Sequence, residues 1–260
     1  MKIFKEHNFE YATCGAPGGQ WITLSHPVGS DLRIWDSHIA ELSQQYRVLV
    51  YNTRGHGGDV RDESTCNVRD LADDVIRLWE YLGIARSHFV GLSLGGCVGV
   101  ALASNAPTRV STLTVVNSRL EMDELASIGW SQRAELAESE GMRPLVNPMI
   151  ERWLTPAFVA THPVEVGVVK QTLLATSPNG FAACARALAD MRLKQALAGL
   201  SVPTLFLAGL SDNAVPSDIT RHYADQNPAF SFAAIPGPHI LNLENPEGFN
   251  QAVLGFLTNT

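Results

Sequence analysis

Short apolar runs and segments with helical spacing alternate along most of this chain. The runs are rich in β-forming residues and are typical of buried strands, and apolar residues three or four positions apart are typical of helices with one buried face. Regular alternation favours a mostly parallel sheet with helices on both faces, so the predicted fold class is α/β. The predicted strands are residues 21–24, 46–51, 110–116, 202–208 and 230–235 and one that runs into Gly91, and the predicted helices are residues 32–44, 67–82, 97–106, 216–225 and 246–257.

Two regions depart from this alternation. Residues 2–14 are predicted to form an antiparallel hairpin, and between residues 119 and 199 only helical segments interrupted by glycines and prolines are expected. A helical insert between two strands of a parallel sheet is interpreted as a lid over the carboxyl edge of the sheet, where ligands bind in such folds. We therefore expect residues 1–118 and 200–260 to form the core and residues 119–199 to form the lid.

The sequence Gly91-Leu92-Ser93-Leu94-Gly95 lies between a predicted strand and a predicted helix. In that context a Gly-x-Ser-x-Gly is typical of a nucleophile elbow, a sharp turn that strains the serine backbone and exposes its hydroxyl. Gly91 and Gly95 are expected to be small because strand and helix approach closely there. Ordinary glycine-rich turns can also carry this motif, so its position between strand and helix makes Ser93 the candidate nucleophile.

A nucleophilic serine needs a base, and the base needs a carboxylate that orients it. Asp212 follows the predicted strand 202–208, and His239 follows the predicted strand 230–235. Both loops belong to the sheet edge at which the elbow lies, so Ser93, Asp212 and His239 are predicted to form a catalytic triad. Taken singly, Asp212 could be a turn former and His239 a residue before a helix, but their succession at strand ends favours the triad.

Acyl transfer also needs two N–H donors for the oxyanion of its tetrahedral intermediate. Leu94 follows the nucleophile at a helix N-terminus and is the first candidate. The loop after strand 21–24 is expected to supply the second, from the backbone N–H of Val28, although this loop could also be a plain turn. Strand 110–116 ends in Asn117, which cannot act as a carboxylate, so Asp212 stays the predicted acid.

Composition narrows the class of protein. A chain of 260 residues with 45% hydrophobic content can bury one core, or one core with an insertion. The net charge is −7 and the basic residues are dispersed, which argues against a nucleic-acid partner. We expect a cytoplasmic protein with no membrane partner, because the chain shows no apolar signal region or bilayer-length apolar run. Widely spaced cysteines and isolated histidines indicate neither disulfides nor a metal site.

Further motifs connect the chain with a known family. In the core they are residues 24–31, 53–57, 71–75, 91–96 and 203–212, and in the insert they are residues 130–133, 140–142, 151–153 and 180–184. With these motifs and the chain order Ser, Asp, His, the protein resembles the α/β-hydrolase superfamily over nearly all its length, and within it the 3-oxoadipate enol-lactonases. Asn52 departs from the family pattern, in which an aspartate precedes Thr-Arg-Gly-His-Gly.

The resemblance implies an α/β-hydrolase fold, with a mostly parallel sheet flanked by helices and an inserted all-helical lid. It also implies a serine esterase that opens 3-oxoadipate enol-lactone to 3-oxoadipate in aromatic-compound catabolism (the beta-ketoadipate pathway), without a cofactor. Because that lactone carries a carboxylate, a lid cation is expected at the pocket, and the candidates are Arg133 and Arg152. Trp130 and Trp153 are expected to line the same pocket. Each arginine could instead be solvated, and each tryptophan could serve only packing.

Other functions stay open on the sequence. A hydrolase of carbon–carbon bonds in ring-cleavage products and a general short-chain carboxylesterase would use the same triad on a different bond. A ligand receptor on the same fold would keep the pocket without turnover, although the complete triad argues against it. The expected partner is therefore a small lactone or ester, and the sequence allows a homo-oligomer.

Overall fold

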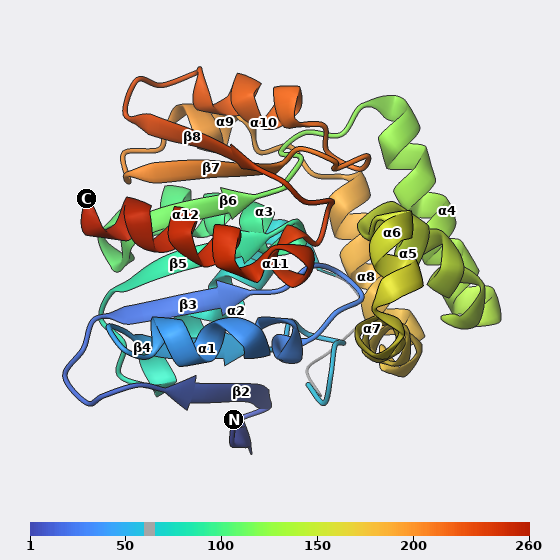
Figure 1. The fold of residues 1–260 in the computed structure, drawn as a ribbon, viewed down its shortest axis with the longest axis horizontal. Helices are drawn as coiled ribbons and strands as arrows, with labels where there is room; N and C mark the ends of the chain where they lie inside the picture. Colours follow the sequence, from blue (N-terminus) through green and yellow to red (C-terminus); the bar gives the residue numbers. More distant parts are fainter. Residues whose placement is uncertain (60–65) are drawn as a thin grey trace.

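One sheet runs through the middle of the molecule (Figure 1). In the computed structural model, which describes residues 1–59 and 66–260, it has eight strands in the order β1-β2-β4-β3-β5-β6-β7-β8. β2 pairs antiparallel with β1 and β4, and all other neighbours are parallel, which confirms the predicted fold class. The strands are β1 (Ile3–Glu6), β2 (Phe9–Cys14), β3 (Trp21–Ser25), β4 (Arg47–Tyr51), β5 (Ser87–Leu92), β6 (Val110–Val116), β7 (Thr204–Gly209) and β8 (Phe230–Ile235).

Helices cover both faces of this sheet because its central strands are apolar on both sides. Every residue of β5 and of β7 is buried, for example. Helices α1 and α12 pack together on one face, and α2 and α3 pack together on the other (Figure 1). The core helices are α1 (Asp36–Leu42), α2 (Val68–Tyr81), α3 (Leu94–Asn105), α10 (Ser217–Ala224), α11 (Leu241–Glu244) and α12 (Pro246–Thr258), with 3₁₀ helices at Leu32–Trp35 and Pro107–Arg109.

Local signals at the helix starts explain some of these boundaries. Asn67 caps α2 in a capping box, in which its side chain accepts backbone N–H groups and the Asp70 carboxylate accepts the N–H of Asn67. The continuous helix predicted over residues 32–44 is wrong in its first turn. The Asp31 carboxylate accepts the N–H of Arg33 and closes a tighter 3₁₀ turn before α1 begins.

The segment 119–199 lies beyond one end of the sheet and contributes no strand to it (Figure 1). Its two ends run side by side, since Glu121 and Arg192 form an isolated antiparallel bridge. Prolines that interrupt the helical pattern open the next helices instead, because proline suits the first helical position. The division into core and lid domains stays a prediction. The helices of the segment are α4 (Glu124–Glu140), α5 (Val146–Trp153), α6 (Pro156–Thr161), α7 (Pro163–Ala175), α8 (Pro178–Ala189) and α9 (Lys194–Ala198), with a 3₁₀ helix at Arg143–Leu145.

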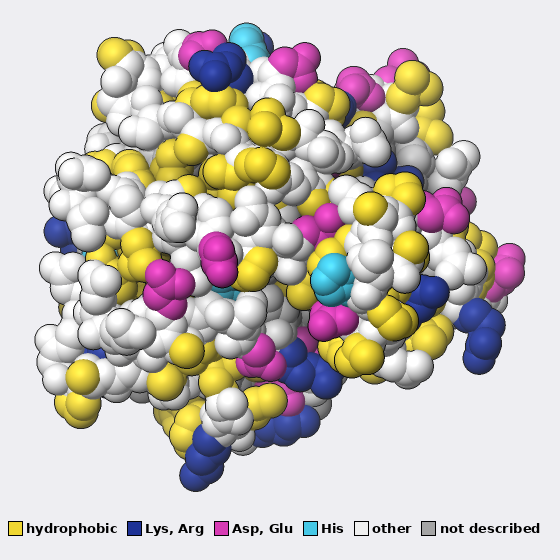
Figure 2. Space-filling view, in the orientation of Figure 1, with side chains coloured by type: hydrophobic (Ala, Val, Ile, Leu, Met, Phe, Trp, Pro, Cys, Tyr) yellow, Lys and Arg dark blue, Asp and Glu magenta, His cyan; other side chains and the backbone are white. Residues whose placement is uncertain are grey.

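The surface carries charges of both signs. On the face seen in Figure 2, basic side chains lie in small separate groups among acidic ones. Two helices of the 119–199 segment also contact core helices, α9 against α3 and α8 against α2. Within the described residues, every helix is too short or too polar to cross a membrane.

Two buried histidines hold the loop after β3 against the loop after β4. Nε2 of His26 accepts the N–H of Thr53 at 3.0 Å, and Nε2 of His56 accepts the N–H of Gly29 at 2.8 Å. Each ring donates from Nδ1 to a nearby backbone carbonyl, so each is neutral and carries its hydrogen on Nδ1. A second proton would remove the acceptor at Nε2, and the loop that contains Gly29 would lose a hydrogen bond.

Burial keeps these rings neutral. It lowers the pKa of His26, and it lowers the pKa of His56 to about 3, where the neighbouring His26 adds to the effect. The pKa of His38, which donates to Asn250 between α1 and α12, is also lowered by burial. These histidines therefore make the folded state sensitive to acid.

We predict that the free energy of unfolding decreases as the pH falls below about 6.5, the ordinary pKa of histidine in an unfolded chain. In that range the unfolded chain binds protons on its histidines, whereas the folded chain, with lowered pKa values, does not, so protons favour unfolding. His56 alone contributes up to about 1.4 kcal/mol per pH unit. Urea unfolding at several pH values between about 7.5 and 5 measures this slope.

His56→Gln, whose side-chain oxygen can accept the same N–H, should make the slope shallower. His222→Gln is the matched control because His222 is exposed, and it should keep the slope of the wild type. An unchanged slope in His56→Gln would contradict the role given to His56.

Candidate functional site

The turn between β5 and α3 is strained at Ser93. Its φ of +56° and ψ of −112° lie where few residues with a side chain are found. A Cβ on Gly91 would lie 2.1 Å from the carbonyl oxygen of Gly95, and a Cβ on Gly95 would lie 2.2 Å from that of Ser25. The close approach predicted at the two glycines is therefore confirmed, and Gly95 brings α3 against β3.

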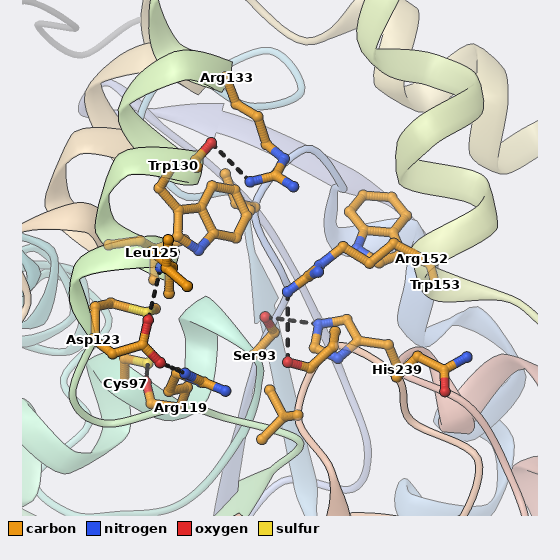
Figure 3. Close-up of a pocket in the computed structure, with 18 residues that line it drawn as sticks. Ser93, Cys97, Arg119, Asp123, Leu125, Trp130, Arg133, Arg152, Trp153 and His239 are labelled. Carbon is orange, nitrogen blue, oxygen red and sulfur yellow. Dashed lines mark hydrogen bonds and ion pairs between the residues drawn. The ribbon is translucent and has the colours of Figure 1, made fainter.

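His239 lies between Ser93 and Asp212. Its Nε2 is 3.0 Å from Oγ of Ser93 (Figure 3), and its Nδ1 is 2.8 Å from Oδ2 of Asp212. A carboxylate can only accept, so Nδ1 carries the hydrogen and Nε2 is free to accept from the serine hydroxyl. This is the arrangement in which an imidazole can take the proton of an attacking serine.

Asp212 is held by its other oxygen as well. Oδ1 accepts the backbone N–H of Ala214 at 2.6 Å and that of Val215 at 3.0 Å, and the side chain is buried. Asp212 and His239 are 5% and 4% exposed, so little water competes for the hydrogen bond between them. The structure thus brings together the three residues that the sequence places after β5, β7 and β8.

The two backbone N–H groups predicted for the oxyanion lie beside this site. Leu94 is the first residue of α3, where the N–H groups of a helix have no intrahelical acceptor. Val28 is buried in the loop after β3 and lines the same cavity as Ser93. Within the residues that the structure describes, neither N–H finds a hydrogen-bond acceptor. Both remain available to a developing negative charge.

A cavity of about 370 Å³ lies between this hydrogen-bonded chain and the helices of segment 119–199 (Figure 3). A cavity of this size suits a small molecule. Helix α4 lines it with Trp130 and Arg133, and α5 lines it with Arg152 and Trp153. All four residues proposed to contact substrate therefore reach the cavity, although both tryptophans are also largely buried in the protein.

Arg133 and Arg152 bring positive charge into the cavity. Among the described residues, neither forms an ion pair with a carboxylate; Arg133 donates to the carbonyl of Gly129 at 2.8 Å, and Arg152 makes a long contact of 3.5 Å with that of Ala214. Burial lowers the pKa of both guanidinium groups. The charge of Arg133 lowers the pKa of Arg152 further, and Asp212 partly offsets this. An anion in the cavity would relieve both effects.

Sequence reasoning missed several residues that line the cavity. Arg119 follows β6 at the same sheet edge as Ser93, Asp212 and His239, so the rule that located Asp212 also locates Arg119. Its charge is neutralised by Asp123, at 2.7 Å, which also caps α4. The sequence carries no comparable signal for the apolar part of the lining, which includes Met122 and Leu125.

Cys97 also lines the cavity, one helical turn after Ser93. Burial raises the pKa of its thiol to about 12, and Sγ donates to the carbonyl of Arg119. Cys97 is therefore a neutral thiol and no competitor to Ser93 as nucleophile. Across the described residues, no group of three or more His, Cys, Asp and Glu side chains is arranged to hold a metal ion.

Known proteins are similar to this chain in sequence and in fold. Residues 16–252 match the model of the alpha/beta hydrolase family. The 3-oxoadipate enol-lactonase 2 of Acinetobacter baylyi (strain ATCC 33305 / BD413 / ADP1) is 31% identical over 243 residues, which are 94% of this chain and 90% of that protein. A putative carbamate hydrolase of Caulobacter sp. (strain K31) is 30% identical over 248 residues, 92% of this chain and 91% of that protein.

A solved structure is also similar to this chain. The enol-lactonase from Burkholderia xenovorans LB400 superimposes with a TM-score of 0.94 and 31% sequence identity, over 99% of this chain and 100% of that chain. Its likeness covers the helical segment 119–199 as well as the sheet. Because the family match and this likeness extend over nearly the whole chain, the protein belongs to the alpha/beta hydrolase family.

Proposed function

We propose that this protein is a serine hydrolase that opens 3-oxoadipate enol-lactone to 3-oxoadipate. Ser93 is the nucleophile, His239 the general base and Asp212 the carboxylate that orients it. The observation that carries the proposal is the continuous hydrogen-bonded chain from Asp212 through His239 to Ser93, at a cavity with two arginines that have no carboxylate partner within the described residues. The enol-lactonases among the relatives support a lactone as the bond attacked.

In the first half of the reaction, His239 takes the proton of Ser93 while Oγ attacks the lactone carbonyl. The oxyanion that forms is stabilised by the N–H groups of Val28 and Leu94, and the positive end of the α3 dipole acts in the same direction. Collapse of the intermediate breaks the bond to the ring oxygen and leaves an acyl-enzyme. The released enolate takes up a proton and becomes a ketone, which makes ring opening hard to reverse.

In the second half, water replaces the serine as nucleophile. His239 takes a proton from the water, the hydroxide attacks the acyl-enzyme, and Ser93 leaves with the proton that His239 returns. Asp212 keeps the hydrogen of His239 on Nδ1 and stabilises the imidazolium that forms in both halves. The product carries one carboxylate more than the lactone, and no cofactor takes part in either half.

The carboxylate of the lactone is proposed to bind Arg133, Arg152 or both. A guanidinium can hold a carboxylate through two parallel hydrogen bonds, and a site partly shielded from water strengthens them. The contact of Arg152 with Ala214 also ties it to the loop that carries Asp212. Among the described residues, Arg133 forms its hydrogen bond with Gly129 and none with that loop, and it is therefore the cleaner test of substrate binding.

A small carbamate is the second candidate substrate, because a putative carbamate hydrolase is 30% identical to this chain, against 31% for the enol-lactonase. The same residues would attack a carbamate carbonyl and expel ammonia or an amine instead of an enolate. A neutral carbamate would gain nothing from the two arginines, so the charge of the cavity favours the lactone.

We predict that the protein hydrolyses 3-oxoadipate enol-lactone in preference to p-nitrophenyl acetate and to a small carbamate. Ser93→Ala should lower kcat on every accepted substrate by at least about 1,000-fold, because the group that forms the acyl-enzyme is removed. Steady-state kinetics on the three substrates measure both effects. Ester turnover that needs Ser93, without lactone turnover, would leave the triad in place and reject the lactone.

Arg133→Gln should lower kcat/KM for the anionic lactone by about 10- to 100-fold, the usual weight of a hydrogen-bonded charge pair. The same variant should change kcat/KM for neutral p-nitrophenyl acetate by less than about threefold. Arg186→Gln is the matched control, because Arg186 pairs with Glu138 on the outside of the same segment. Equal losses of Arg133→Gln on both substrates would show that Arg133 supports the fold rather than the carboxylate.

A further inference from the structure

The residue after β6 is buried in an unusual conformation. Asn117 has a φ of +45°, in the left-handed region that residues with a side chain seldom occupy, and it is fully buried. Asparagine tolerates this region better than most residues, because its short polar side chain can bond to nearby backbone. Such a conformation persists only where the surroundings hold it, and here the amide of Asn117 has three partners.

All three partners lie in, or directly before, the two loops that carry Asp212 and His239. Oδ1 of Asn117 accepts the N–H of Gly209, the last residue of β7, at 2.8 Å. Nδ2 donates to the carbonyl of Pro238 at 3.0 Å and to that of His239 itself at 2.8 Å. The side-chain oxygen of Asn117 therefore binds at the start of the loop that carries Asp212, and its NH₂ group donates both hydrogens to the loop that carries His239.

The same short segment also holds the nucleophile. The backbone N–H of Ser93 donates to the carbonyl of Val116 at 2.8 Å, and the hydroxyl of Ser118 donates to the carbonyl of Ser93 at 2.9 Å. Residues 116–118 are thus bonded to the backbone at or near all three members of the proposed triad. Neither Asn117 nor Ser118 belongs to the cavity lining, so their role is distinct from substrate contact.

The loops that carry Asp212 and His239 are packed closely against each other. A Cβ on Gly209 would lie 2.5 Å from the carbonyl oxygens of Gly237 and of Pro238. The start of the loop that carries Asp212 is therefore in contact with the loop that carries His239. The carbonyls of Pro238 and His239 converge on Asn117 and would lose this donor if it were removed. The surroundings of Asn117 offer two acceptors and one donor, and an amide matches them because it has two N–H donors and an acceptor oxygen. A carboxylate at this position would place an oxygen next to the two carbonyl oxygens, where it could not donate.

We propose that Asn117 is a positioning residue, whose amide sets the loops of Asp212 and His239 relative to each other and so aims the imidazole at Ser93. It touches neither substrate nor the reacting atoms. The inference rests on the triad in the proposed function and is independent of whether the substrate is a lactone. Its physical basis is that a displacement of a catalytic group by about 1 Å can cost about 100-fold in rate.

The test uses two variants that remove the donors in different ways. Asn117→Gly keeps the left-handed backbone accessible and deletes the whole amide. Asn117→Asp keeps the size and the acceptor for Gly209 and loses both donors. Asn250→Ala is the control, since Asn250 is another buried amide with two side-chain partners, His38 and Glu41, within the α1–α12 contact, and it does not line the cavity.

Kinetics with p-nitrophenyl acetate, labelling of Ser93 by a fluorophosphonate and thermal unfolding are measured on all four proteins. We expect both Asn117 variants to lower kcat and the labelling rate by about 10- to 100-fold, with KM changed less than about twofold. Asn250→Ala should lose a similar amount of thermal stability and keep kcat within about twofold of the wild type.

The experiment distinguishes failure of the role proposed for Asn117 from failure of the proposed nucleophile. A folded Asn117→Gly or Asn117→Asp that keeps the kcat and labelling rate of the wild type overturns the role of Asn117, and so does an equal loss of kcat in Asn250→Ala. Failure of the fluorophosphonate to label the wild type at Ser93 would instead reject the nucleophile of the proposed function, and with it the triad that Asn117 is inferred to align.

Discussion

The rest of the site depends on how closely β5, α3 and β3 are packed around Ser93. No side chain fits at Gly91 or Gly95, so the helix begins directly on top of the sheet and Ser93 is forced into a strained backbone conformation. Such strain costs about 1–3 kcal/mol and persists only where surrounding structure outweighs it. Here β5 is buried along its length and α3 is buried from Leu94 to Ala103. The burial of their apolar side chains stabilises the fold and offsets the free-energy cost of the strained turn.

Neutral polar side chains then connect the loops at the carboxyl edge of this sheet. His26 and His56 hold the loop that contains Val28, and Asn117 joins the loops of Asp212 and His239. Loops cannot bury their backbone groups without partners, and these side chains provide partners without bringing in charge. The geometry of the candidate site is therefore held in part by groups that stay uncharged at neutral pH, and the histidines among them lose that property in acid.

The cavity, by contrast, carries charged side chains. Arg133 and Arg152 are partly buried near one another without a carboxylate partner in the described part of the chain, which costs stability. Arg119, which lines the same cavity, is neutralised by Asp123. An anionic ligand would supply the missing partner, so the binding energy of its carboxylate is available to hold the reacting carbonyl at Ser93. This links the unfavourable electrostatics of the cavity to the substrate class that we propose.

The sequence by itself determined the fold class, the elbow and the order of the candidate triad. Those features are local: apolar periodicity, glycines at a tight turn and polar residues directly after strands all lie within a few positions of one another. Only the tertiary structure decided what meets across the sheet edge, such as the amide of Asn117 bonded to Gly209 and His239, or α4 and α5 bringing two arginines into one cavity. Asn117 was recognisable in sequence only as a residue that cannot be the acid, because its partners lie 92 and 122 positions away and no local pattern encodes them.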